Sequence, residues 1–119
     1  MLELSHKKLI AWQKAIQLLP LIYEICSKLP KEENYNIISQ MKRAALSVSN
    51  NLAEGASRKT KPDKKRFFQI SRSSIVAIDN CLTAIVVLNY LSEKDLANIN
   101  VALVELFKLI SGLIDSNDQ

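Results

Sequence analysis

The sequence predicts an all-α protein, folded as an antiparallel up-and-down four-helix bundle in one domain covering residues 1–119. Two observations lead to this prediction. Apolar residues recur every three or four positions through four long segments, which is the spacing of amphipathic helices. Two glycines and three prolines leave little material for turns, so the elements should be few and long. A chain of 119 residues can bury one core but is too short for two.

The first two helices are expected at about 8–29 and 31–54. Pro30 should stop the first helix because it lacks the backbone N–H that a helix interior requires. Gly55 is expected to end the second helix in a left-handed conformation, which glycine adopts at little cost. That conformation would set the direction of the loop that follows.

The third and fourth helices are expected at about 60–91 and 92–116. Thr60 and Ser92 each stand three residues before an aspartate. This spacing is typical of a capping box, in which two side chains satisfy free N–H groups at a helix start. Since the connections are short, helices that follow one another should be antiparallel neighbours.

The first and third helices carry more apolar surface than one core requires. We expect Ile16 and Tyr23 to face the core, with Leu18 outside it. A second exposed stripe would favour aggregation, whereas contact with another subunit would bury it. We favour self-association; the alternative is that one generous core absorbs these residues. The apolar positions outside the expected core are Ala11, Leu18, Leu21, Ile25 and Leu29 in the first helix and Ile70, Ala77, Cys81, Ala84 and Leu88 in the third.

The stretch 39–58, SQMKRAALSVSNNLAEGASR, separates into an apolar and a polar face on a helix of about 100° per residue. The polar face is unusual because it holds amides, hydroxyls and one candidate ion pair, where a solvated face usually carries Lys and Glu. We favour a hydrogen-bonded seam, with Arg43 and Glu54 satisfied by neighbouring subunits or by helix ends, over a recognition surface that lines a groove or pore. This row, called the polar seam below, consists of Gln40, Arg43, Ser47, Asn50, Asn51 and Glu54.

The same stretch resembles a known family, the four-helix-bundle proteins encoded by intervening sequences within bacterial 23S ribosomal RNA genes. The resemblance implies a closed homo-oligomer, with a pentamer favoured, and it implies no particular biochemical activity. Ala77, Cys81 and Ser73 stand where the family commonly has Glu, Gln and Gly, so any contact made by that Glu in relatives is not implied here. Shorter matches extend the resemblance over nearly the whole chain: Leu9, Trp12, Gln13, Lys14, Ala15, Tyr23, Leu29, Pro30, Glu33, Phe67, Ser74 and Gly112 to Ile114.

Positive charge is concentrated in one short stretch. Residues 55–72 hold seven basic side chains and one acid, whereas the other residues hold nine basic and eleven acidic ones. Such a cluster can neutralise phosphates and bind RNA or DNA without sequence preference. The alternative is a merely solvated helix start, and no exposed aromatic residues are expected among the cations to stack on bases. These residues, called the basic patch below, are Arg58, Lys59, Lys61, Lys64, Lys65, Arg66 and Arg72.

No residue pattern indicates catalysis, a metal or a cofactor. The single histidine, His6, precedes the first helix, and Cys26 and Cys81 are expected on apolar faces as free thiols in a reducing cytoplasm. One histidine and two separated cysteines cannot form a tetrahedral zinc site. No signal peptide is recognised and no run of about 18 apolar residues occurs, so no membrane span is expected.

The sequence therefore favours a non-catalytic, cytoplasmic, oligomeric scaffold that contacts RNA or DNA through the basic patch. The alternative is a protein–protein interaction adaptor with no nucleic-acid binding.

Overall fold

The computed structural model describes residues 1–118, and within them it has four α-helices and no strand, so the predicted all-α fold is confirmed. The second helix differs most from expectation, because a 3₁₀ turn precedes it and it begins at Ile37. The elements in chain order are η1 (Ser5–Lys8), α1 (Ile10–Ser27), η2 (Lys31–Glu33), α2 (Ile37–Ser57), α3 (Lys61–Val87), η3 (Lys94–Leu96) and α4 (Ala97–Ser116).

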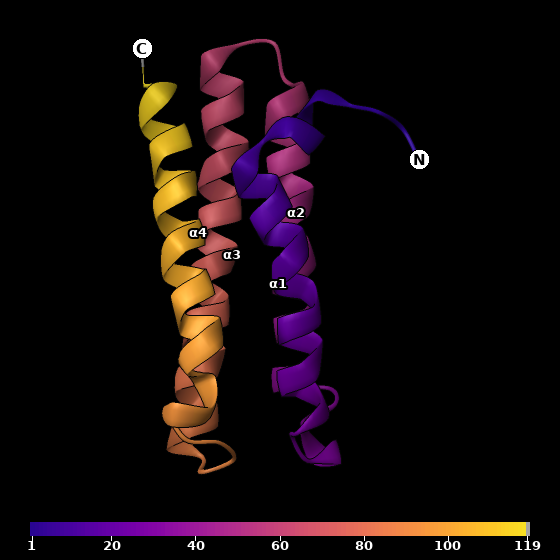
Figure 1. Ribbon diagram of the computed structural model, residues 1–119, viewed down its shortest axis with the longest axis vertical. Helices are drawn as coiled ribbons and strands as arrows, with labels where there is room; N and C mark the ends of the chain where they lie inside the picture. The colour runs from indigo at the N-terminus through magenta and orange to yellow at the C-terminus, as the bar shows by residue number, and fades with distance from the viewer. Residues whose placement is uncertain (119) are drawn as a thin grey trace.

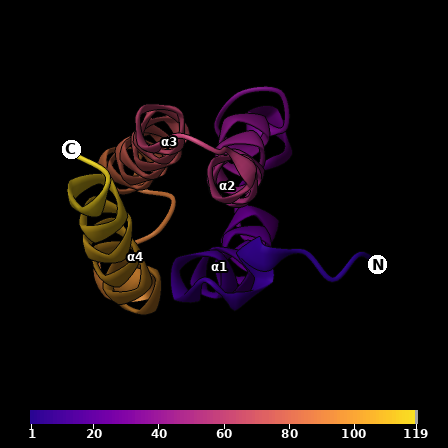
Figure 2. The same cartoon turned by 90° about the horizontal axis from the view of Figure 1, so that it is seen from above.

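The helices lie side by side along the 44 Å long axis of the molecule (Figure 1). Seen from above, they occupy four corners in the order α1, α2, α3, α4, so that α1 and α3 lie diagonally across the centre (Figure 2). The link between α2 and α3 lies at the end of the molecule that also holds both chain ends. The other two links, which contain η2 and η3, lie at the opposite end (Figure 1).

A single cluster of buried apolar side chains fills the centre, and it includes Ile78 and Leu103. The expected core face of the first helix was wrong. Leu18 is 1% exposed, whereas Tyr23 is 52% exposed and Ile16 37% exposed. The physical reason is that α1 packs against both α2 and α4. These two neighbours bury a face of α1 that is turned about the helix axis toward Leu18 and away from Tyr23. Leu18 is therefore a core residue of the subunit.

The other residues of the proposed second apolar stripe fall into a buried group and an exposed group. Ala11, Ile25, Leu29 and Cys81 are buried in the core, as the alternative of one generous core requires. On α3, by contrast, Ile70 is 43% exposed, and Leu88, the residue after that helix, is 49% exposed. Exposed apolar surface therefore remains on both helices, at Ile70 on α3 and, on α1, at Ile16 and Tyr23 in place of the positions expected from the sequence.

The prediction for Gly55 was wrong. Gly55 lies inside α2, is buried, and none of the described glycines has a positive φ. A Cβ atom on Gly55 would stand 2.6 Å from Cε1 of Phe68 on α3, closer than real Cβ contacts allow. Glycine is needed here because the two helices approach closely. Further along the same contact, the buried Ser71 hydroxyl donates a 2.8 Å hydrogen bond to the carbonyl of Val48.

Both predicted capping boxes contribute hydrogen bonds at helix starts. The Asp63 N–H donates to Thr60 Oγ1 over 3.3 Å at the start of α3. Before η3, Ser92 N–H donates to Asp95 Oδ2 (2.9 Å) and Asp95 N–H donates to Ser92 Oγ (3.2 Å). The hydrogen bonds from Ser92 lower the pKa of the Asp95 carboxyl. In the second box, therefore, the side chain of each residue accepts a hydrogen bond from the backbone N–H of the other.

The third helix ends at Val87, earlier than expected, in a left-handed turn at Asn89 with φ of 62°. Tyr90 N–H donates to the Ile85 carbonyl and Asn89 N–H donates to the Val86 carbonyl, both over 3.0 Å. This pair of bonds is the Schellman pattern, which satisfies free carbonyls at a helix end.

We predict that Gly55→Val lowers the free energy of unfolding by about 2 kcal/mol or more, because the new side chain overlaps buried Phe68. Gly112→Ala is the matched control. Gly112 also lies inside a helix, but a Cβ there meets nothing within 4 Å, so the substitution should stabilise by up to about 1 kcal/mol. Urea unfolding measures both. Equal stability of Gly55→Val and the parent protein would contradict the close-approach account.

Candidate nucleic-acid interface and the adjoining polar seam

The basic patch lies at the end of the molecule where α2 connects to α3 (Figure 1). The link is short: α2 ends at Ser57, Arg58 is extended, and Thr60 already caps α3. Because the link has only three residues, the last turn of α2 and the first turns of α3 hold the patch on a rigid frame.

Four members of the patch are exposed: Arg58, Lys59, Lys61 and Arg66. Lys59 and Lys61 make no ion pair and no side-chain hydrogen bond to residues 1–118. Arg58 pairs with Glu54 at 3.1 Å and Arg66 with Asp63 at 3.8 Å. Exposed pairs of this kind are weak, so these cations stay available to other anions.

A patch that neutralises phosphates needs exposed cations, but three of its members are half-buried: Lys64, Lys65 and Arg72. Lys64 Nζ donates to the Ala56 carbonyl over 3.0 Å. Lys65 forms an ion pair with Asp118, and Arg72 Nη1 donates to Ser111 Oγ over 3.0 Å. The end of α2 covers Lys64, whereas the C-terminal end of α4 and the residues after it lie against α3 at Lys65 and Arg72. The patch therefore does not continue along α3 as a free surface.

The aromatic ring of Phe67 lies among the cations, where no exposed aromatic residue was expected from the sequence. Phe67 is half-buried. The guanidinium carbons of Arg58 and Arg66 lie 4.6 Å and 4.9 Å from its ring centroid. Each contact is a cation–π interaction, which holds the two arginine heads in place. In the sequence, Phe67 directly follows Arg66 and stands nine positions after Arg58, a placement that could have suggested this contact.

The inner part of the polar seam is hydrogen-bonded within the subunit. Asn51 Nδ2 donates to the carbonyl of Ser47 (2.8 Å) and to its hydroxyl (3.0 Å). On α3, Ser74 Oγ donates to Ser47 Oγ over 2.9 Å. No buried side-chain polar atom lacks a partner within residues 1–118. For Ser47 and Asn51, these bonds favour the hydrogen-bonded seam over the recognition surface.

The outer part of the seam, Gln40, Arg43 and Asn50, is exposed. Gln40 and Arg43 line a shallow hollow between α2 and α3 together with Ala44, Ser47 and Ser74. Glu54, the last member, belongs with Arg58 to the basic end. The structure thus divides the seam into two parts, and its role stays a prediction.

A buried carboxylate, which sequence reasoning did not single out as a site, lies at the opposite end of the molecule. Glu33 is 8% exposed, and it accepts hydrogen bonds of 3.1 Å from Asn36 Nδ2 and from the Tyr90 hydroxyl. Partial burial and the hydrogen bond with Glu33 raise the pKa of Tyr90. These bonds fasten the turn before α2 to the end of α3.

The two cysteines and the histidine lie in different settings. Burial raises the pKa of the Cys26 thiol, although the Lys42 charge acts in the opposite sense, and burial also raises the pKa of Cys81. His6 lies in η1 with its ring edge-on to Trp12, 5.0 Å between centroids. Within residues 1–118, no group of three or more His, Cys, Asp or Glu residues could hold a metal ion.

The fold and these contacts define an all-α protein with four helices, a basic end and a polar α2–α3 seam. Residues 7–112 match the family described as 23S rRNA-intervening sequence protein, so the chain belongs to that family. The resemblance stated from the sequence is thereby confirmed. Among curated proteins, none matches the chain.

We predict that Tyr90→Phe destabilises the fold by about 1–3 kcal/mol, because it leaves the buried Glu33 carboxylate short of a donor. Tyr35→Phe, at a side chain that is 98% exposed, is the control and should leave stability unchanged. Urea unfolding at neutral pH measures both; equal effects would contradict the role given to Tyr90.

A pH dependence also follows. The raised pKa of Tyr90 means that the folded state holds the phenol proton where the unfolded chain has begun to lose it, above about pH 10. The stability of the parent protein should therefore fall as the pH rises past that point, and Tyr90→Phe should lack this component of the fall. Unfolding midpoints between pH 8 and 11 measure it; parallel curves would contradict it.

Proposed function

We propose that the protein is a non-catalytic cytoplasmic scaffold. In this proposal, the four helices form an antiparallel up-and-down bundle that assembles into a closed homo-oligomer, and the basic patch contacts the phosphates of RNA or DNA. Five copies are favoured, following the family resemblance. The observation that carries the nucleic-acid part is the excess of positive charge toward one end of the molecule. Among residues 1–118, the ion pairs of the seven cations involve three carboxylates, Glu54, Asp63 and Asp118.

The contacts of the patch favour recognition of phosphates over recognition of bases. Lys59 and Lys61 are exposed and unpaired within the described part of the chain, as an ammonium that neutralises a phosphate must be. Phe67 already contacts the guanidinium groups of Arg58 and Arg66, so its ring has little free face on which a base could stack. Binding should therefore depend steeply on salt and little on sequence. Repetition of the patch in an oligomer would add weak contacts together.

Self-association is supported by apolar surface that the subunit leaves exposed. Two helical segments, α3 and Lys94–Ser116, are long and apolar enough to span a membrane, by length and composition alone. In the most apolar 18 residues of each segment, a third of the residues or fewer are buried within the subunit. Core helices of a water-soluble bundle pass the same test. We propose that other subunits, with no membrane, cover this surface.

The alternative function is a protein–protein interaction adaptor that binds no nucleic acid. One observation favours it: Gln40 and Arg43 are exposed beside the shallow α2–α3 hollow, where polar groups could bind a protein partner.

We predict that light scattering gives a mass several times the 13.4 kDa of one chain. Leu88→Glu should lower that mass while the helical circular dichroism is kept, because Leu88 is 49% exposed. Leu103→Glu is the contrast: it buries a charge at a core position that is 4% exposed and should unfold the subunit. A parent protein that is monomeric at every micromolar concentration would contradict self-association.

We predict that Lys59→Glu with Lys61→Glu weakens binding to RNA and DNA of unrelated sequences by about tenfold or more at low salt, equally for all sequences. The matched control is Lys31→Glu with Lys94→Glu, which makes the same charge change at exposed positions of the opposite end and should weaken binding less. Fluorescence anisotropy measures both.

Equal losses in the two double variants would show that only overall charge matters and would contradict the assignment of the site. No binding by the parent protein at low salt would favour the adaptor.

A further inference from the structure

We propose that the N-terminal arm, residues 1–4, of one subunit binds in the groove between α3 and α4 of a second copy of the same chain. This inference rests on the proposed self-association and specifies one contact of the assembly.

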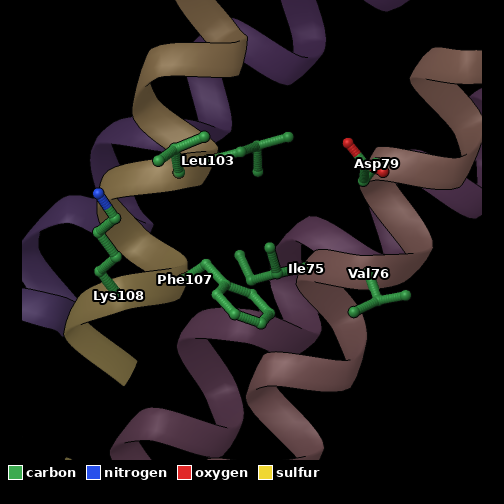
Figure 3. Close-up of a pocket in the computed structure, with 7 residues that line it drawn as sticks. Ile75, Val76, Asp79, Leu103, Phe107 and Lys108 are labelled. Atoms are coloured by element: carbon green, nitrogen blue, oxygen red, sulfur yellow. The ribbon is translucent and has the colours of Figure 1, made fainter. Parts of the chain in front are cut away.

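The groove has an apolar floor and charged flanks. Its volume is about 270 Å³, and it is lined by Val76, Val104, Lys108 and other side chains of the two helices. Ile75 on α3 and Phe107 on α4 point toward one another across it, with Asp79 on the α3 side and Lys108 on the α4 side (Figure 3).

The groove walls are not covered within the subunit. Val76 is 57% exposed, Val104 55% and Phe107 39%, while Ile75 and Leu103 below them are buried. Asp79 and Lys108 form no ion pair with residues 1–118. A segment that binds in this groove should therefore place apolar side chains on the floor and charged side chains beside the flanks.

The N-terminal arm has this composition. Met1 is fully exposed, Leu2 is 71% exposed and Leu4 51% exposed, and Glu3 stands between the two leucines without an ion pair to any described residue. The backbone at Leu4 is extended, so Leu2 and Leu4 can point to one side and Glu3 to the other. Leucines on the groove floor would leave Glu3 near its rim, within reach of the long Lys108 side chain.

The base of the arm is fixed, which gives the arm a defined direction. Gln13 Nε2 donates to the Lys7 carbonyl over 2.9 Å, and Lys7 Nζ donates to the Leu2 carbonyl. His6 packs edge-on against Trp12. From this base the arm extends away from the helices on the side of α1 and α2 (Figure 2).

The arm cannot reach the groove of its own subunit. Side chains of α3 and α4 form the groove, and these two helices lie on the side of the molecule opposite the arm (Figure 2). Four extended residues span at most about 14 Å, whereas the two shorter dimensions of the molecule are 29 and 21 Å. A donor and an acceptor on opposite sides make a head-to-tail contact, and such contacts close into rings when the rotation between subunits allows.

A disulfide between subunits tests the contact directly. Leu4→Cys and Val104→Cys are made in separate chains, mixed and oxidised gently; both native thiols are buried. The proposal expects a covalent dimer from the mixture. Leu4→Cys mixed with Val101→Cys is the control, because Val101 is 69% exposed on the same helix but does not line the groove. Equal crosslinking in the two mixtures, or none in either, would overturn the proposal.

A second test measures the strength of assembly in the double variant Leu2→Ser with Leu4→Ser. The concentration at which the assembly half-dissociates should rise by about 100-fold or more, since two leucines lose their burial. Tyr35→Ser removes a large side chain that is 98% exposed, more than either leucine, and should change little. Glu3→Lys and Lys108→Glu should each weaken assembly, and the two together should restore part of it.

These tests separate the two proposals. An assembly that persists at the same concentrations in the arm variants overturns the arm contact and leaves self-association intact. A parent protein that is monomeric throughout overturns both.

Discussion

The close approach of α2 and α3 is the constraint on which the rest of the structure depends. At Gly55 the two helices lie so near that a single added carbon would overlap the Phe68 ring. The same proximity brings the Ser71 hydroxyl to the Val48 carbonyl in a fully buried hydrogen bond, and the Ser74 hydroxyl to Ser47. Because the helices are already in contact where α2 ends, a link of three residues is enough to join them.

That short link determines the electrostatics of the basic end. It holds Arg58 beside the first turns of α3, where its guanidinium lies over the Phe67 ring. The C-terminal end of α4 then engages the flank of the patch, through Asp118 on Lys65 and Ser111 on Arg72. Lys59 and Lys61, at the tip, are left without an ion pair to any residue that the structure describes. Positive charge at the start of α3 opposes the helix dipole, so this arrangement costs some stability that a bound anion would offset.

Much of the fold could be predicted from the sequence, because local rules decide it. Apolar spacing located all four helices, and the Thr60 and Ser92 boxes marked two of their starts. Gly55 was misjudged because glycine serves both a left-handed turn and a close helix contact, and only the neighbouring helix distinguishes them. The buried face of α1 was misjudged because it depends on two neighbours, α2 and α4. For the candidate site, the cations were found from charge alone, but Arg72 meets Ser111 across 39 positions of sequence, which no local pattern reveals.

The salt dependence of binding tests the central claim, that the exposed tip of the basic patch neutralises nucleic-acid phosphates. The logarithm of the association constant is measured against the logarithm of salt concentration for the parent protein and for Lys59→Gln with Lys61→Gln. The account predicts a steep line for the parent and a slope smaller by about two for each bound patch in the variant. Binding that is insensitive to salt, or the same slope in both proteins, would contradict it.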